Sequence, residues 1–302
     1  MQYINFEEQR LSKLSFGTVQ LGLEYGIANT AGRPTQQTAN GIIEYLIDSG
    51  VNSFDTAVAY GNSEEVLGQA LEGYSDICVI SKVQTDLFSS EIKSVVEESL
   101  KRLKSSRLFA LLLHDAKLLS QWSDMQTEKV AMLIDGGMIR YFGVSVYTER
   151  EFALALENPM VKIIQIPFNI FDQRAVNGGW FKKARDAGKL LFIRSIFLQG
   201  LFFLHTEELK GALVSAAPFL DKMHDIRQKL GLSVSQFAMA YVNSASTDAV
   251  LLFGCDTQAQ AKENIENFNT LPSIDTDMQK EINQFFSEVP ATVYNPSQWK
   301  IT

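Results

Sequence analysis

Short apolar runs alternate with amphipathic stretches along almost the whole chain. The runs are rich in Val, Ile, Leu and Phe, which is typical of strands buried on both faces. The stretches between them place apolar residues three and four positions apart, as a helix with one buried face does. This alternation predicts strands over residues 11–19, 51–56, 77–82, 108–114, 138–146, 161–169, 189–197 and 248–254.

Helices are expected between and after these strands. Ser63 is a plausible N-cap for the second of them. Ser233 with Gln236, and Thr257 with Gln260, have the spacing of a capping box, which predicts two further helix starts. The expected helices cover residues 38–50, 64–71, 89–105, 122–136, 148–157, 178–188, 206–230, 233–245, 257–268 and 275–287, and a surface arm follows them.

Eight strands that alternate with helices predict a (β/α)8 barrel, the TIM-barrel fold. No linker or low-complexity segment divides the sequence, so residues 1–302 are expected to form a single domain. The stretches 206–230 and 275–302 are then additional C-terminal segments of that domain. The alternative is an open doubly wound sheet of the Rossmann type, but no G-x-G-x-x-G motif follows any predicted strand.

The composition narrows the class of protein only a little. The chain is 46% hydrophobic and 21% charged, as ordinary globular proteins are. A net charge of −8 without a basic cluster favours neither nucleic acid nor a membrane surface as partner. Two distant cysteines, Cys78 and Cys255, form neither a disulfide framework nor a zinc motif. With no apolar leader and no long apolar run, we expect a reduced, cytoplasmic protein.

Candidate chemistry lies at the downstream ends of three consecutive strands. Asp55, Lys82 and His114 are separated by intervals that suit one strand, one helix and two loops, about 30 residues. They are therefore expected at the same end of neighbouring parallel strands, where barrels carry their active sites. Tyr60 follows Asp55 by five residues and is expected in the loop above that strand.

These four residues suit proton transfer. An ammonium group close to a phenol favours the phenolate and makes the phenol a better acid. Lys82 could act in this way on Tyr60, and Asp55 could hold Lys82 in place. Tyr60 would then be a general acid, and His114 could hydrogen-bond a carbonyl oxygen. An acid directed at a carbonyl, with no nucleophile or metal cluster in evidence, suits carbonyl reduction by a hydride donor.

Each of these residues taken alone would more often be structural, and only their grouping favours catalysis. Four aromatic residues, Tyr25, Phe168, Phe197 and Trp299, have two interpretations. They are expected mainly to pack in the core or loops, and the alternative is that they form an aromatic rim around a substrate.

Several segments resemble the aldo-keto reductase family. They are GVNSFDTAVAYGNSEEVLGQAL, ISK, LLLH, GMIRYFGVS and FGCDTQAQAKENI, and the resemblance extends from about Leu14 to Asn267. It implies a (β/α)8 barrel that reduces aldehydes and ketones with NADPH or NADH, without a Rossmann fold. The family's catalytic tetrad would be Asp55, Tyr60, Lys82 and His114.

The resemblance also implies how the nicotinamide and pyrophosphate are bound. Ser145 and Gln165 would hold the carboxamide, although Val146 stands where the family often has Asn. Arg194 falls where an aromatic residue usually stacks on the nicotinamide, and its guanidinium plane could stack there too. The remaining residues implied at this end of the cofactor are Gly17, Thr18, Asp55, Ser195, Leu198 and Gly200.

The adenosine end departs most from the family pattern. The helix that opens after Gly254 should offer free N–H groups to a 2′-phosphate. Asp256 stands where Arg is common, and Gln260 where some members have another Arg. A carboxylate would repel a phosphate but can accept a hydrogen bond from a free ribose hydroxyl. The sequence therefore favours neither NADP(H) nor NAD(H). Glu263 and Asn264 match the positions that reach the adenine.

We therefore expect an NAD(P)H-dependent oxidoreductase that acts on a small carbonyl substrate, as a monomer or weak homo-oligomer. One alternative is a nicotinamide-bound regulatory or binding barrel with little turnover. Another is an unrelated barrel lyase or hydrolase, which would not bind a nicotinamide. The natural substrate is not readable from the loops, although the long loop over residues 20–34 weakly suggests a sugar carbonyl.

Overall fold

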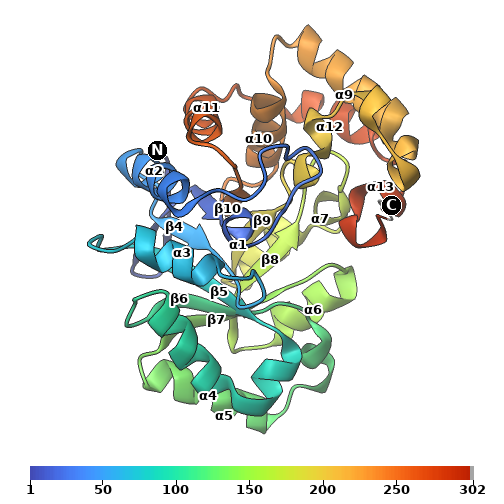
Figure 1. Ribbon diagram of the computed structural model, residues 1–302. Coiled ribbons are helices and arrows are strands. Elements are labelled where there is room, and N and C mark those ends of the chain that lie inside the picture. The colour runs from blue at the N-terminus through green and yellow to red at the C-terminus, as the bar shows by residue number, and fades with distance from the viewer. Residues whose placement is uncertain (300–302) are drawn as a thin grey trace.

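The computed structural model describes residues 1–299. Parallel strands close into a barrel in the order β10, β3, β4, β5, β6, β7, β8, β9 (Figure 1). This confirms the predicted (β/α)8 fold. The barrel strands are β3 (Leu14–Gly17), β4 (Ser53–Asp55), β5 (Cys78–Val83), β6 (Leu108–Leu113), β7 (Ile139–Ser145), β8 (Val161–Pro167), β9 (Leu190–Arg194) and β10 (Ala249–Phe253).

Helices pack around the outside of the barrel (Figure 1). The α-helices are α1 (Val19–Gly22), α2 (Gln36–Asp48), α3 (Ser63–Ala70), α4 (Thr85–Arg102), α5 (Asp124–Asp135), α6 (Glu149–Glu157), α7 (Arg174–Asn177), α8 (Trp180–Asp186), α9 (Ala217–Lys229), α10 (Val234–Ala245), α11 (Gln258–Asn269), α12 (Thr276–Phe285) and α13 (Ala291–Tyr294). Short 3-10 helices are η1 (Lys117–Gln121), η2 (Leu198–Phe203), η3 (Thr206–Glu208), η4 (Gly211–Ala216) and η5 (Pro296–Gln298). Helices from the C-terminal third of the chain, such as α9 and α12, form an additional group at one side of the barrel (Figure 1). No helix within residues 1–299 is both long and apolar enough to cross a membrane.

Alternation along the strands divides the core into two parts, because successive side chains of a strand point to opposite faces. One set, which includes Phe16, Phe54 and Phe142, packs against the surrounding helices. The other set, which includes Ile80, Leu112 and Phe192, fills the inside of the barrel. The strands are thus apolar on both faces, and the inside of the barrel is packed.

An N-terminal hairpin closes the amino end of the barrel. Its strands β1 (Tyr3–Phe6) and β2 (Gln9–Ser12) pair antiparallel. Leu11 belongs to the interior cluster, Ile4 and Phe6 pack against it, and the ring of Phe6 lies 5.3 Å from that of Tyr141. The sequence did not predict this hairpin, because its strands are short and its turn lacks the usual Gly or Asn.

Three predicted helix boundaries were wrong. Residues 206–216 form 3-10 turns instead of an α-helix, and α9 begins only at Ala217, where Pro218 occupies the first turn. Pro is favoured at a helix start because the N–H it lacks would have no partner there. Asn62 instead of Ser63 is the N-cap residue of α3. Helix α4 begins earlier than expected, at Thr85, and is kinked at Glu91.

Candidate active site

The strand alternation that fills the barrel also places polar side chains at its carboxyl end. On β5, Cys78 and Ile80 belong to the interior cluster, so Lys82 is the next side chain to point inward. On β6, Ala110 and Leu112 lead in the same way to His114. The residues placed at the mouth by this rule are Asp55, Lys82, His114, Ser145, Gln165 and Arg194.

Lys82 and Asp55 form a buried ion pair at the base of this mouth. Lys82 Nζ lies 2.5 Å from Asp55 Oδ2 and also donates to the Thr56 carbonyl at 2.9 Å. The other carboxylate oxygen, Oδ1, accepts from Gln165 Nε2 at 2.9 Å. Both charges are therefore paired and hydrogen-bonded, as buried charges must be. The pair holds the Lys82 ammonium in one position.

Tyr60 reaches the same mouth from the loop between β4 and α3. The Lys82 ammonium lies 5.0 Å from the centre of its ring, and the His114 ring lies edge-on to it with centroids 5.6 Å apart. The backbone of this loop is held by a bond from Tyr60 N to the Ala57 carbonyl at 3.0 Å. The structure thus brings the four predicted catalytic residues together.

Burial affects the two basic groups of this cluster differently. Burial alone would lower the pKa of Lys82, but the charges and hydrogen bonds of Asp55 and Tyr60 together outweigh it, and the pKa of Lys82 is raised. Burial, followed by the charges of Lys82 and Arg194, lowers the pKa of His114 to about 4. At neutral pH the cluster therefore contains a cationic lysine and a neutral imidazole, which can still donate one N–H.

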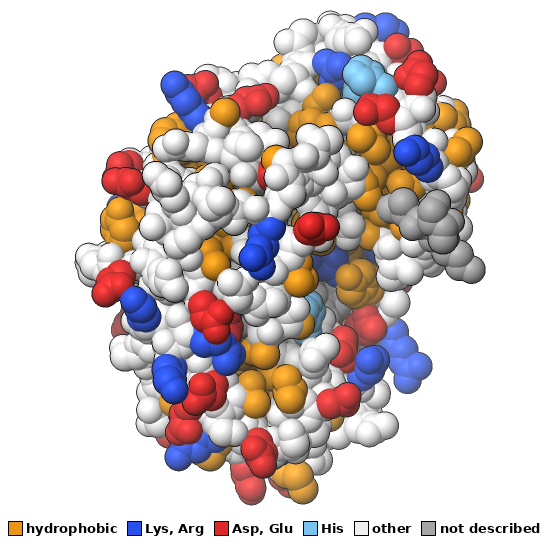
Figure 2. All heavy atoms as spheres, in the orientation of Figure 1, with side chains coloured by type: hydrophobic (Ala, Val, Ile, Leu, Met, Phe, Trp, Pro, Cys, Tyr) orange, Lys and Arg blue, Asp and Glu red, His pale blue; other side chains and the backbone are white. Residues whose placement is uncertain are grey.

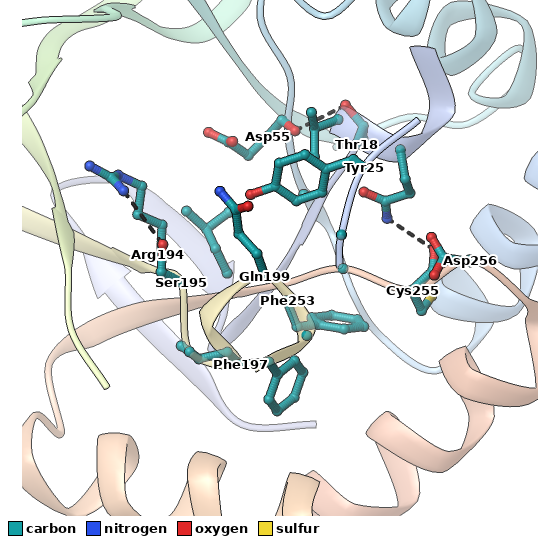
Figure 3. Close-up of a pocket in the computed structure, with 18 of the residues that line it drawn as sticks. Thr18, Tyr25, Asp55, Arg194, Ser195, Phe197, Gln199, Phe253, Cys255 and Asp256 are labelled. Atoms are coloured by element: carbon teal, nitrogen blue, oxygen red, sulfur yellow. Dashed lines mark hydrogen bonds between the residues drawn. The ribbon is translucent and has the colours of Figure 1, made fainter. Parts of the chain in front are cut away.

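A cavity of about 570 Å³ extends from the tetrad to the start of α11. In Figure 3, Asp55 and Arg194 lie at one side of it and Cys255 and Asp256 at the other. Figure 2 shows basic and acidic side chains near the middle of this face, with uncharged surface around them. The predicted site residues in its wall are Gly17, Thr18, Asp55, Tyr60, His114, Ser145, Gln165, Arg194, Ser195, Gly200, Gly254, Asp256, Gln260, Glu263 and Asn264.

Two predicted site residues do not line this cavity. Lys82 lies beneath its floor, with 1% of its surface exposed, and acts on the cavity through its charge. Leu198 has a positive φ of 48° and a fully buried side chain, so the structure places that side chain in the core. Positive φ values at Gln199 and Gly200 show that the loop after β9 turns tightly here.

Several cavity residues come from loops and short helical turns and were not predicted. The long loop after α1 is tied across the cavity by a bond from Ile27 N to the Gln199 carbonyl at 2.9 Å. Loops and single turns have no periodicity, so the hydrophobic pattern could not identify their individual residues. The cavity residues that were not identified from the sequence include Gln20, Asn29, Tyr147, Gln199 and Phe203.

The four aromatic residues with two possible roles separate in the structure. Tyr25 and Phe197 line the cavity. Phe168 is fully buried and stacks on Tyr241 at 5.4 Å, which confirms the core interpretation for this residue. Trp299 donates its ring N–H to the Val293 carbonyl at 3.0 Å, and Pro296 is the tail residue that lines the cavity.

The start of α11 is less open to an anion than the sequence suggested. Gln260 Oε1 accepts from Asp256 N at 2.7 Å and from Thr257 N at 3.2 Å, and Gln260 N donates to Thr257 Oγ1. The predicted capping box is thus confirmed, and it uses N–H groups that were expected to be free. Burial raises the pKa of Asp256, and among the described residues no Lys or Arg pairs with it.

Comparison with known proteins shows which family the chain belongs to. A model of the aldo/keto reductase family matches residues 13–285, and the chain belongs to this family. A probable voltage-gated potassium channel subunit beta from Arabidopsis thaliana is 24% identical, with 96% of this chain and 98% of the relative covered.

Solved structures share the fold. The glycerol dehydrogenase AKR11B4 from Gluconobacter oxydans has a TM-score of 0.77 at 21% identity and covers 97% of both chains. An aldo/keto reductase from Klebsiella pneumoniae in complex with NADP and acetate has a TM-score of 0.72 at 19% identity, covering 94% of this chain and 95% of its own.

Proposed function

We propose that this protein is an NAD(P)H-dependent oxidoreductase that reduces an aldehyde or ketone to an alcohol. The observation that carries the proposal is the buried Lys82–Asp55 pair beneath Tyr60, with His114 opposite, at the end of one cavity. Family membership supports the same class of reaction.

The lining of the cavity suits a nicotinamide dinucleotide. Ser145 and Gln165 offer polar groups beside the tetrad, and the Gln165 amide keeps an oxygen and a second N–H after it donates to Asp55. Asp256 and Asn264 lie at the other end. A bound NAD(P)H would supply the hydride for the carbonyl carbon.

The residues of the chain supply the proton and orient the substrate. Tyr60 donates its hydroxyl proton to the carbonyl oxygen. Lys82, kept cationic by Asp55, stabilises the negative charge that then remains on the tyrosine oxygen. The neutral His114 donates a hydrogen bond that orients the carbonyl oxygen towards Tyr60. Gln165 keeps Asp55 in the position that this arrangement needs.

The test is a fluorescence titration with NADPH and NADH, followed by turnover of a carbonyl panel with the cofactor that binds more tightly. Tyr60→Phe should lower kcat by about 10²- to 10⁴-fold, since one positioned acid contributes about that much. Its cofactor Kd should stay within about twofold. Tyr74→Phe, a change at an exposed tyrosine, is the matched control. An unchanged kcat in Tyr60→Phe would show that another group is the acid.

A second candidate is a nicotinamide-bound regulatory or binding barrel with little turnover. It is favoured by the relative named as a probable potassium channel subunit beta, which this chain matches along nearly its whole length. Tight nicotinamide binding without turnover across the carbonyl panel, together with co-purification of a partner, would favour it over the reductase.

A further inference from the structure

Arg194 points into the mouth of the barrel. On β9, Leu190 and Phe192 belong to the interior cluster, so alternation directs Arg194 inward at the carboxyl end of the strand. The side chain is only partly buried, and it lines the same cavity as Tyr60 and His114.

The protein leaves the hydrogen-bonding capacity of this guanidinium largely unused. One face stacks on the Tyr147 ring, with Cζ 4.0 Å from the ring centre. Nη1 has a long contact of 3.5 Å to Ser195 Oγ, and the buried Nη2 has no hydrogen-bond partner. Among the described residues, no carboxylate forms an ion pair with Arg194. Buried donors of charged groups are costly without acceptors, which indicates that a ligand completes the site.

The position of Arg194 favours the substrate over the adenosine part of a cofactor. Figure 3 shows Arg194 on the Asp55 side of the cavity, with Asp256 on the opposite side. Its charge is also close enough to contribute to the lowered pKa of His114. A group bound by Arg194 would therefore lie close to the carbonyl that His114 orients.

We propose that Arg194 binds a carboxylate or phosphate group of the carbonyl substrate, so that the protein prefers anionic aldehydes and ketones to neutral ones. This inference rests on the proposed reductase function. A guanidinium presents its N–H groups in a planar fork that matches a carboxylate or phosphate. Contact with the Tyr147 ring, 4.0 Å from Cζ, restricts how that fork can move. Because the chain has a net charge of −8, a local cation is needed to attract an anionic substrate.

The test compares matched pairs of carbonyl compounds at saturating cofactor. The pairs are succinic semialdehyde with butanal, and glyceraldehyde 3-phosphate with glyceraldehyde, which also distinguish a carboxylate from a phosphate. Wild-type kcat/KM should be at least about tenfold higher for the anionic member of one pair. Arg194→Gln should reduce that ratio by about tenfold or more, mainly through KM, and Arg194→Lys should keep part of it.

Arg150→Gln provides the control for overall charge, because it removes the same charge from an exposed position on α6. In this variant the ratio of kcat/KM for the anionic and neutral substrates should equal that of the wild type. Two results would overturn the proposal. One is a wild-type ratio near one for both pairs. The other is a ratio that Arg194→Gln leaves unchanged while the Kd for NADPH rises at least tenfold, which would assign Arg194 to the cofactor.

A binding experiment separates this inference from the proposed reaction. Calorimetry with succinate and with butane-1,4-diol, with and without NADPH, requires no turnover. Succinate binding that Arg194→Gln abolishes, in a protein that reduces none of the carbonyls, would keep the anion site and reject the reductase function. Reduction of the neutral aldehydes without any succinate binding would support the reductase function and reject the anion site.

Discussion

His114 is a neutral imidazole held beside two cations. Burial and the charges of Lys82 and Arg194 lower its pKa from 6.5 to about 4. An imidazole that stays neutral between pH 5 and 8 can present the same N–H to a carbonyl oxygen across that range. The protein loses stability at acid pH, because His114 binds a proton in the unfolded chain at pH values where it stays neutral in the folded protein.

The pH dependence of stability should show this cost. Since the folded pKa is depressed, the stability due to neutral His114 is complete above pH 6.5 and is lost as the pH falls towards 4. A shift of this size corresponds to at most about 3 kcal/mol. The measurement is urea unfolding of wild type and His114→Gln from pH 4 to 8. The wild type should lose more stability than the variant below pH 6.5, and parallel curves would contradict the assigned shift.

Among the elements, the one-turn helix α1 packs against the loop that carries Tyr60, the residue that we propose as the acid. Gly22 packs directly on the loop that carries Tyr60. A Cβ atom at Gly22 would lie 1.8 Å from the Tyr60 carbonyl oxygen and 2.6 Å from Ser63 N. Its φ is not in the left-handed region, so the need for glycine here comes from this close approach alone. Any side chain at this position must displace the Tyr60 loop.

Gly22→Ala should therefore lower activity more than stability alone explains. Overpacking of this kind costs about 1–3 kcal/mol, and a displacement near 1 Å of a catalytic group costs about 10²-fold in rate. The measurements are kcat/KM on a good aldehyde and urea unfolding. Gly41→Ala in α2 is the control, because its nearest neighbours would be 3.7 Å away. Gly41→Ala should keep its activity, and its free energy of unfolding should rise by about 1 kcal/mol. Full activity in Gly22→Ala would show that the loop can adjust.

The strands and helices that could be predicted from the sequence are those with a periodic hydrophobic pattern. Buried strands such as β6 and amphipathic helices such as α2 have a repeating pattern. The spacing of the strands was enough to predict that Asp55, Lys82 and His114 lie at one end of the barrel. The hairpin β1–β2 and the cavity loop around Gln199 have no such pattern. Contacts such as Gly22 against Tyr60 depend on three-dimensional proximity between segments, which the order of residues does not reveal.

At the scale of the whole molecule, a ligand in the cavity would link parts of the chain that are far apart in sequence. Residues from the loop after α1, the ends of β7 and β8, the loop after β9 and the start of α11 all line it. A ligand that binds only the folded chain stabilises the whole of it, by about 2.7 kcal/mol at a concentration 100 times its Kd. Cofactor choice can thus be measured as thermal stability.

Asp256→Arg should change the preference between NADPH and NADH. Wild-type melting temperatures should rise with a nicotinamide cofactor, and the variant should shift the ratio of Kd values towards NADPH by about tenfold, roughly 1.4 kcal/mol. The reason is that a cation replaces a carboxylate that would repel a 2′-phosphate. Asp225→Arg makes the same charge change at an exposed position of α9 and should leave the ratio unaltered. If both variants behave alike, Asp256 does not face the 2′ position.

The hairpin that closes the amino end of the barrel has a practical consequence for handling the protein. The first residues lie at the floor, beside Gly50, which Met1 approaches closely. Pro296, near the other terminus, lines the mouth. A purification tag or surface tether attached before Met1 therefore leaves the ligand entrance open, whereas one attached after Thr302 follows a segment that borders it.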